Sequence, residues 1–94
     1  MLRAFSFFYF FKKIDEGALD GLKYLKEINL SNNTLNSLEN NLFLKTISLN
    51  VINFNYNNLK TIDEQLFMPI MNNLINNEDS LITFEGIIFC HLFV

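Results

Sequence analysis

Apolar positions recur along this chain in two rows of equal length, residues 25–48 and 49–72. The row at 25–48 opens with LKEINLSNNTL, and the row at 49–72 opens with LNVINFNYNNL. Each row then continues into a phrase of the form L-x-x-[LI]-x-x-x-x-F. The shared apolar columns hold Leu25, Ile28, Leu30, Leu35, Leu38 and Phe43 in one row, and Leu49, Ile52, Phe54, Leu59, Ile62 and Phe67 in the other. A run of apolar residues at fixed spacings in both rows indicates a structural repeat.

The spacing within each row predicts its local structure. Ile28 and Leu30 are two residues apart, so on an extended chain both side chains point to the same side. We therefore expect a short strand at the start of each row and a parallel sheet where the rows stack. Asn33 and Asn57 share a column at the turn after the strand, where an amide can satisfy buried backbone N–H and C=O groups. The second phrase predicts an irregular or helical arc that returns the chain to the next strand.

The pattern resembles the 24-residue class of leucine-rich repeats, L-x-x-L-x-L-x-x-N-x-L-x-x-L-x-x-x-x-F-x-x-L. Residues 18–35, ALDGLKYLKEINLSNNTL, follow this consensus closely. The resemblance implies an α/β-type solenoid, a short horseshoe segment with a parallel β-sheet on its concave face and irregular or helical arcs on its convex face. It also implies that Asn33 and Asn57 form a structural asparagine ladder.

The repeat divides the chain into three parts. Residues 25–72 match two full leucine-rich repeats. Residues 1–24 match only in their second half, because Ala4 and Ser6 occupy the strand columns, so they predict a degenerate first repeat with an apolar N-terminal stretch. Residues 73–94 leave the register and predict either a degenerate repeat or an apolar tail. Within them, FEGI (84–87) echoes LDGL (19–22).

The columns between the inward residues supply the candidate binding surface. In leucine-rich repeats these columns face the concave side, where the family usually binds proteins. Here they are polar and rich in amides, with Tyr56 as a plausible aromatic anchor; the alternative is that they are merely exposed strand residues. The predicted partner-binding residues are Lys26, Glu27, Asn29, Ser31, Asn32, Asn50, Val51, Asn53, Asn55 and Tyr56.

In row 1–24 the same columns are mostly apolar, namely Leu2, Arg3, Phe5, Phe7 and Phe8. Exposed apolar side chains in such number are unfavourable. This stretch is therefore expected to form a cap, to pack on a neighbour or to lie in a membrane interface. It is far shorter than the ~20 residues of a membrane-spanning helix.

Charge and composition exclude several functions. The net charge is −3, and the seven basic residues are spread between Arg3 and Lys60. They do not form the basic patch that a phosphate backbone needs, so nucleic-acid binding is not expected. The repeated acidic pairs at 15–16 and 63–64 fall on the outer arcs and are expected to be solvated. The single cysteine, Cys90, excludes an intramolecular disulfide and a cysteine-based zinc site. No catalytic residues, metal ligands or cofactors are predicted, and the protein is not expected to be an enzyme.

The sequence thus favours a non-catalytic protein-interaction module that binds a protein partner on the concave face. One alternative is a small membrane-peripheral protein anchored by the Phe-rich N-terminus, with Lys12 and Lys13 at the headgroups. Another is a truncated repeat fragment without independent function. Because no polar caps are recognisable, we expect a fragment of a longer repeat protein or self-association through uncapped ends. The family resemblance favours an extracellular protein or an ectodomain, whereas the lone cysteine and the lack of a clear signal peptide favour the cytoplasm.

Overall fold

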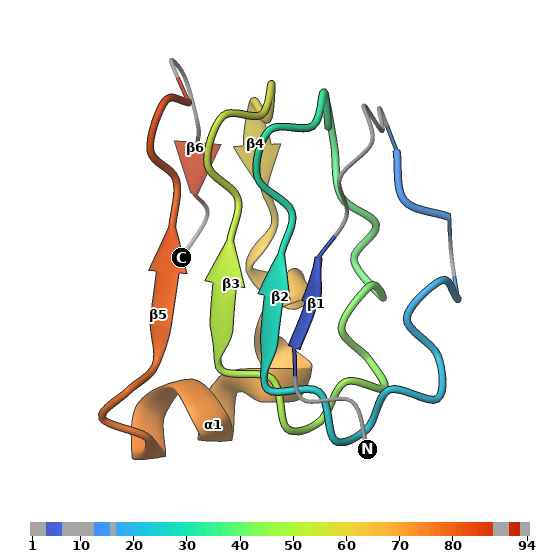
Figure 1. Ribbon diagram of the computed structural model, residues 1–94, viewed down its shortest axis with the longest axis vertical. Helices are drawn as coiled ribbons and strands as arrows, with labels where there is room; N and C mark the ends of the chain where they lie inside the picture. Colours follow the sequence, from blue (N-terminus) through green and yellow to red (C-terminus); the bar gives the residue numbers. More distant parts are fainter. Residues whose placement is uncertain (1–3, 7–12, 16, 88–90, 93–94) are drawn as a thin grey trace.

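Four short strands form one parallel sheet. The computed structural model describes residues 4–6, 13–15, 17–87 and 91–92 of the chain. The strands lie in the order β1 (Ala4–Ser6), β2 (Glu27–Asn29), β3 (Val51–Asn53) and β5 (Leu81–Thr83). They run side by side in the same direction (Figure 1). The connections after β2 and β3 leave this sheet and return to it as the next strand, β3 and β5 respectively.

The strand registers measure the length of each row. Ile28 of β2 pairs with Ile52 of β3, which is the spacing that the repeat predicts. Ile52 pairs in turn with Ile82 of β5, so the step from position 52 to position 82 exceeds the step from 28 to 52 by six residues. With residues 1–24 counted as the first row, the rows of β2, β3 and β5 are the second, third and fourth. The third row is therefore longer than the second. This insertion explains why the period of the first two full rows fails after residue 72.

The extra residues of the third row form helical structure. The arc after β3 contains β4 (Thr61–Ile62), the 3₁₀ turns η1 (Glu64–Leu66) and η2 (Met68–Ile70), and the helix α1 (Met71–Asn76). Asp63 caps η1, since its Oδ1 accepts a hydrogen bond from the Gln65 N–H at 2.9 Å. Figure 1 shows α1 beneath the ends at which the sheet strands begin.

A second, two-stranded sheet joins the arcs of the last two rows. β4 pairs in parallel with β6 (His91–Leu92), and Thr61 is the partner of His91. The arrows of this sheet point against those of the main sheet in Figure 1. The step from position 61 to position 91 equals the step from 52 to 82 in the main sheet. The fourth row thus keeps its register on the third over its outward and its returning segment.

The apolar columns fill the interior. Ten of the twelve column residues are buried, and Leu38 and Phe67 are half-buried against the same core. Phenylalanine rings connect the rows: Phe54 lies 6.4 Å from Phe43 and 5.2 Å from Phe84, between ring centroids. Burial of such side chains contributes about 1.5–3 kcal/mol each. Among them lies the buried hydroxyl of Thr46, which donates to the Phe43 carbonyl at 3.2 Å.

The buried amide of Asn57 links two rows. Its nitrogen donates to the Phe54 carbonyl of its own row at 2.9 Å and to the Leu30 carbonyl of the preceding row at 2.8 Å. Its oxygen accepts from the Leu35 N–H at 3.1 Å. Asn33 is buried one row earlier, and its amide donates to the same Leu30 carbonyl at 3.0 Å. In the fourth row the equivalent position is Ile87, which follows Ile82 as Asn57 follows Ile52.

The register predicted for the first row is wrong by one residue. Ala4 pairs with Glu27 and Phe5 pairs with Ile28, whereas the repeat placed Ala4 opposite Ile28. A shift of one residue exchanges the two faces of a strand. Phe5 thus takes the register position of Ile28, and Ala4 moves to the outward column.

The register of the fourth row, which the sequence left open, is given by its strand pairing. The segment FEGI echoes LDGL in letters only, because Ile82-Thr83-Phe84 takes the place of Ile52-Asn53-Phe54 in the sheet. The repeated Ile-x-Phe was the correct signal. The insertion in the third row hid it from a search at the period of residues 25–72.

A left-handed residue recurs after each of the last three strands of the main sheet. Asn32, Tyr56 and Gly86 have φ values of 59°, 60° and 74°. They occupy equivalent places, since each comes four positions after the central isoleucine of its strand. The left-handed conformation disfavours most side chains, so the turn is specified by its geometry rather than by one residue type.

Candidate protein-binding face and an adjoining hollow

The outward side of the sheet presents two rows of side chains across the strands. One row contains Ala4, Glu27, Val51 and Leu81, and the other contains Asn29, Asn53 and Thr83 together with the register position of Ser6. Leu81 is 56% exposed and Glu27 is exposed. The face is therefore mixed, with an apolar corner at the β5 edge and polar groups at its centre.

The amides of this face use their oxygens internally. Asn29 Oδ1 accepts from the N–H and the hydroxyl of Ser31, at 2.9 and 2.5 Å. Asn53 Oδ1 accepts from the Asn55 N–H at 2.9 Å and from the Thr83 hydroxyl at 3.3 Å. Such bonds to a backbone N–H two residues ahead are typical of Asx turns.

The side-chain oxygen of Asn55 is also occupied within the protein, because it accepts from the Glu85 N–H of the fourth row at 2.6 Å. Within the described part of the chain, the NH₂ groups of Asn29, Asn53 and Asn55 donate no hydrogen bond. The centre of the face is therefore a set of amide donors whose acceptor atoms are already occupied. A complementary surface needs carbonyl or carboxylate oxygens.

Tyr56 lies at the end of this face against the fourth row. Its backbone N–H donates to the Glu85 carbonyl at 2.8 Å. A Cβ added to Gly86 would overlap the Tyr56 ring, so the ring rests directly on the glycine backbone. The side chain is still 50% exposed. One side of the ring is thus packed while the rest remains open to solvent.

Nine of the ten predicted face residues are accessible, and one is not. Lys26, Glu27, Asn32 and Tyr56 are exposed, and Asn29, Ser31, Val51, Asn53 and Asn55 are half-buried. Asn50, predicted to face a partner, is only 6% exposed. It lies between two neighbouring rows, because its N–H donates to the Lys26 carbonyl and its carbonyl accepts from the Leu81 N–H, both at 3.0 Å.

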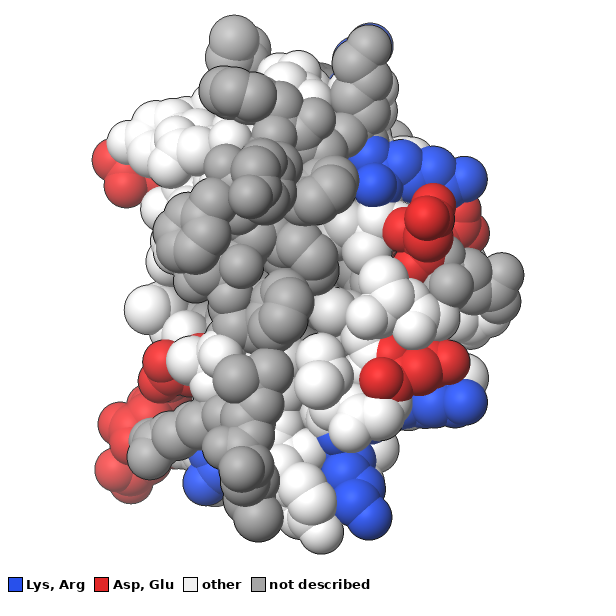
Figure 2. All heavy atoms as spheres, turned by 45° about the vertical axis from the view of Figure 1, so that its right-hand side comes forward, with Lys and Arg blue, Asp and Glu red and all other residues white. Residues whose placement is uncertain are grey.

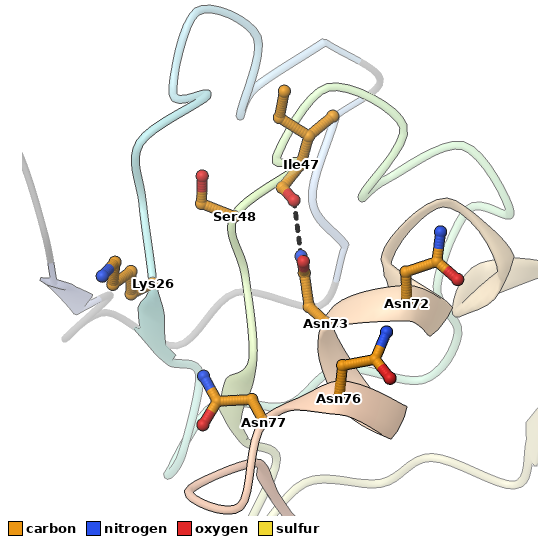
Figure 3. A pocket seen from close by; sticks show the side chains of 7 residues that line it. All are labelled: Lys26, Ile47, Ser48, Asn72, Asn73, Asn76 and Asn77. Carbon is orange, nitrogen blue, oxygen red and sulfur yellow. Dashed lines mark hydrogen bonds between the residues drawn. The ribbon is translucent and has the colours of Figure 1, made fainter.

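A polar hollow lies next to the face, where β2 and β3 begin. Its volume is about 400 Å³ and its lining consists of Lys26, Ile47, Ser48, Asn72, Asn73, Asn76 and Asn77. Figure 3 shows α1 and the residue after it on one side, and Lys26 and the segment before β3 on the other. Asn73 joins the two walls, since its amide donates to the carbonyls of Ile47 at 2.5 Å and Leu49 at 3.2 Å.

Sequence reasoning missed this hollow, although a signal for it exists. Asn72 and Asn76 are four residues apart and so lie on one side of α1, and Asn77 follows directly after the helix. The repeat left residues 73–94 as a degenerate repeat or an apolar tail, because Asn73 and Asn76 fall in columns that should be apolar. They instead belong to the helical arc that the six-residue insertion makes possible.

Charged side chains on the flank of the rows are interleaved. Lys13 pairs with Glu39 at 3.3 Å and Lys45 pairs with Asp20 at 3.5 Å, and all four side chains are largely exposed. Figure 2 shows basic and acidic groups side by side on this flank. Exposed pairs of this kind contribute about 0–1 kcal/mol. They do not form a single-sign patch on this side of the described structure.

The acidic pairs at 15–16 and 63–64 were expected to be solvated. Asp15, Asp63 and Glu64 are exposed, while Glu16 and Cys90 lie outside the described residues. No group of three His, Cys, Asp or Glu residues that could hold a metal ion occurs in the described part. The described helices include none long and apolar enough to cross a membrane. The Phe-rich stretch from Phe7 to Phe11, on which the membrane alternative depends, is not among the described residues.

Comparison with known proteins adds no relative to this picture: no family model, no curated protein and no solved structure matches the chain.

Proposed function

We propose that this chain is a segment of a leucine-rich-repeat solenoid and acts as a non-catalytic module that binds a protein through the outward face of its sheet. Three observations support the repeat assignment. They are the parallel strands in sequence order, the buried apolar columns, and the amide of Asn57 between successive rows. The outward face of the sheet corresponds to the concave face of the family.

The donor character of the face carries the functional proposal. The amide oxygens of Asn29, Asn53 and Asn55 are held by the protein itself, so their NH₂ groups remain fixed in orientation. Preorganised donors lose little entropy when they bind an acceptor. Tyr56 adds an aromatic group next to them, and aromatic residues are enriched in interface hot spots. A protein loop that offers backbone carbonyls around an apolar residue fits this surface.

An isosteric substitution tests the proposal. Asn53→Asp keeps the oxygen that accepts from Asn55 and replaces the outward donor by a second acceptor. The fold is thus retained, while a partner carbonyl meets a carboxylate. We expect capture of the partner to fall at least about tenfold, because an unpaired polar group at an interface costs about 1–3 kcal/mol.

The measurement uses a photo-crosslinking amino acid at Val51, on the face, in otherwise unchanged chain. Irradiation is carried out in the presence of unlabelled competitor protein carrying Asn53→Asp, or carrying Asn58→Asp as the control. Asn58→Asp makes the same charge change, and Asn58 is exposed but lies beyond the face. If both variants compete equally well, the amide face does not bind the partner, and the proposal is refuted.

A further inference from the structure

The polar hollow beside α1 combines features that the binding face does not have. Its volume of about 400 Å³ falls within the ~300–1,000 Å³ of small-ligand sites. It is lined by one lysine, one serine and four asparagines, and by no acidic residue. Its α1 wall belongs to the row that carries the six-residue insertion. Insertions in repeat proteins often serve binding.

The hollow is held open by hydrogen bonds on both walls. Asn73 fixes α1 to the carbonyls of Ile47 and Leu49. On the opposite wall, the Lys26 carbonyl accepts from the N–H groups of Asn50 and Val51, both at 3.0 Å. The backbone of Lys26 is thus fixed where β2 begins, while its ammonium group forms no ion pair in the described part of the chain.

Donors outnumber acceptors on these walls. Asn77 Oδ1 accepts from the Asp79 N–H at 2.9 Å, which leaves the Asn77 NH₂ group as a donor. In Figure 3 this nitrogen lies on the side of the amide that faces Lys26. The side chains of Asn72 and Asn76 form no hydrogen bond within the described residues and add two further amides. Lysine and amide donors together match a carboxylate, and hydrogen bonds to a charged group are the strongest of this kind.

A second hollow indicates what the carboxylate is attached to. It measures about 310 Å³ and shares Lys26 and Asn77 with the first, but its lining also contains Glu27 and Asp79. A carboxylate is an acceptor of hydrogen bonds, so these two side chains are suited to N–H groups of a ligand. An acidic residue within a peptide carries both partners, since its side chain is a carboxylate and its backbone supplies N–H donors.

We propose that the paired hollows bind an acidic side chain, Asp or Glu, presented on an extended peptide. The carboxylate enters between Lys26 and Asn77, and the adjoining peptide N–H groups meet Glu27 and Asp79. The inference rests on the proposed function in taking the ligand to be a peptide. It extends the proposed face, with which the hollows share Lys26 and Glu27, around the starting ends of the strands, and it adds an acidic residue as the determinant.

The test titrates the ¹⁵N-labelled chain with acetyl-Gly-Glu-Gly-amide and with acetyl-Gly-Gln-Gly-amide at constant ionic strength. With the Glu peptide we expect saturable NMR shift changes at residues 26, 47–48 and 72–77. The Gln peptide should bind about tenfold more weakly, since it lacks the charge-assisted bond. Equal shifts with both peptides, or shifts that do not saturate, overturn the proposal. So do shifts that lie elsewhere in the chain.

Two substitutions locate the site. Asn77→Asp keeps the oxygen that accepts from Asp79 and removes the donor, so binding of the Glu peptide should be lost. Lys26→Gln should weaken it about tenfold. Lys23→Gln is the matched control, because the Lys23 ammonium lies 5.2 Å from the Tyr24 ring centroid and does not line the hollow. If Lys23→Gln weakens binding as much as Lys26→Gln, the attraction is nonspecific and the proposal is overturned.

Failure of this proposal and failure of the proposed function can be told apart. Asn77 lies outside the predicted face, and Asn53 lies outside both hollows. Loss of partner capture by Asn53→Asp with no binding of the Glu peptide keeps the face and removes the hollow. The reverse result keeps the hollow and removes the face.

Discussion

The amide of Asn57 bonds to backbone groups of two successive rows, so its removal should test the repeat architecture directly. In Asn57→Ala the Leu35 N–H and the Phe54 carbonyl lose partners at 3.1 and 2.9 Å. The Leu30 carbonyl keeps a donor, because Asn33 also bonds to it at 3.0 Å. Two backbone groups are therefore left without their side-chain partner beside a residue that is only 4% exposed.

The expected loss is a large share of the total stability. An unsatisfied buried group costs about 1–3 kcal/mol, so two groups give a loss of about 2–6 kcal/mol. A chain of 94 residues is stable by roughly 5–14 kcal/mol, at about 0.05–0.15 kcal/mol per residue. Asn57→Ala should therefore fold only marginally, if the amide links the rows as described.

Urea unfolding followed by far-ultraviolet circular dichroism measures this loss. With a slope of about 1.5 kcal/mol per molar urea, a loss of 4 kcal/mol moves the midpoint by about 2–3 M. The control is Asn58→Ala, which removes an exposed amide at the next position and should change the stability by no more than about 0.5 kcal/mol. Midpoints that agree between the two variants would refute the account of Asn57 as the link between rows.

Two further predictions concern the last row. Gly86→Ala should destabilise the protein by about 1–3 kcal/mol, because residue 86 has a φ of 74° and contacts the Tyr56 ring. In a Tyr56→Ala background only the backbone part of this loss should remain. A double-mutant cycle of urea midpoints that shows no coupling contradicts the contact between ring and glycine. The outer edge of β5 has no strand partner among the described residues and carries Leu81, which is 56% exposed. We therefore expect the chain to self-associate along this edge and Leu81→Lys to weaken the self-association. A sedimentation mass of 11.0 kDa at every concentration contradicts this prediction.

Positions that depend on a fixed period could be predicted from the sequence. The apolar columns of the rows that begin at Leu25 and Leu49 are buried because the same contacts recur from row to row. The place of Asn57 follows from the same spacing, since a turn inside the stack leaves backbone groups that only a side chain can satisfy.

The rest depends on features that a period does not contain. Phenylalanine occurs so often between residues 5 and 11 that several registers place an apolar residue inward, and pairing with β2 decides between them. The six-residue insertion hid both β5 and the hollow. Burial of Asn50 arises from rows on either side of it, which no single row reveals.

The column that ends in Ile87 makes the contacts between rows unequal in their response to temperature. The second and third rows share the buried amide of Asn57, whereas the fourth row has Ile87 at that position. In the interior the fourth row meets the third through the stacked rings of Phe54 and Phe84, and its hydrogen bonds to Asn53 and Asn55 lie on the accessible face. Apolar burial becomes weaker on cooling. Cold therefore loosens the interior contact between the third and fourth rows before the contact that Asn57 makes between the second and third.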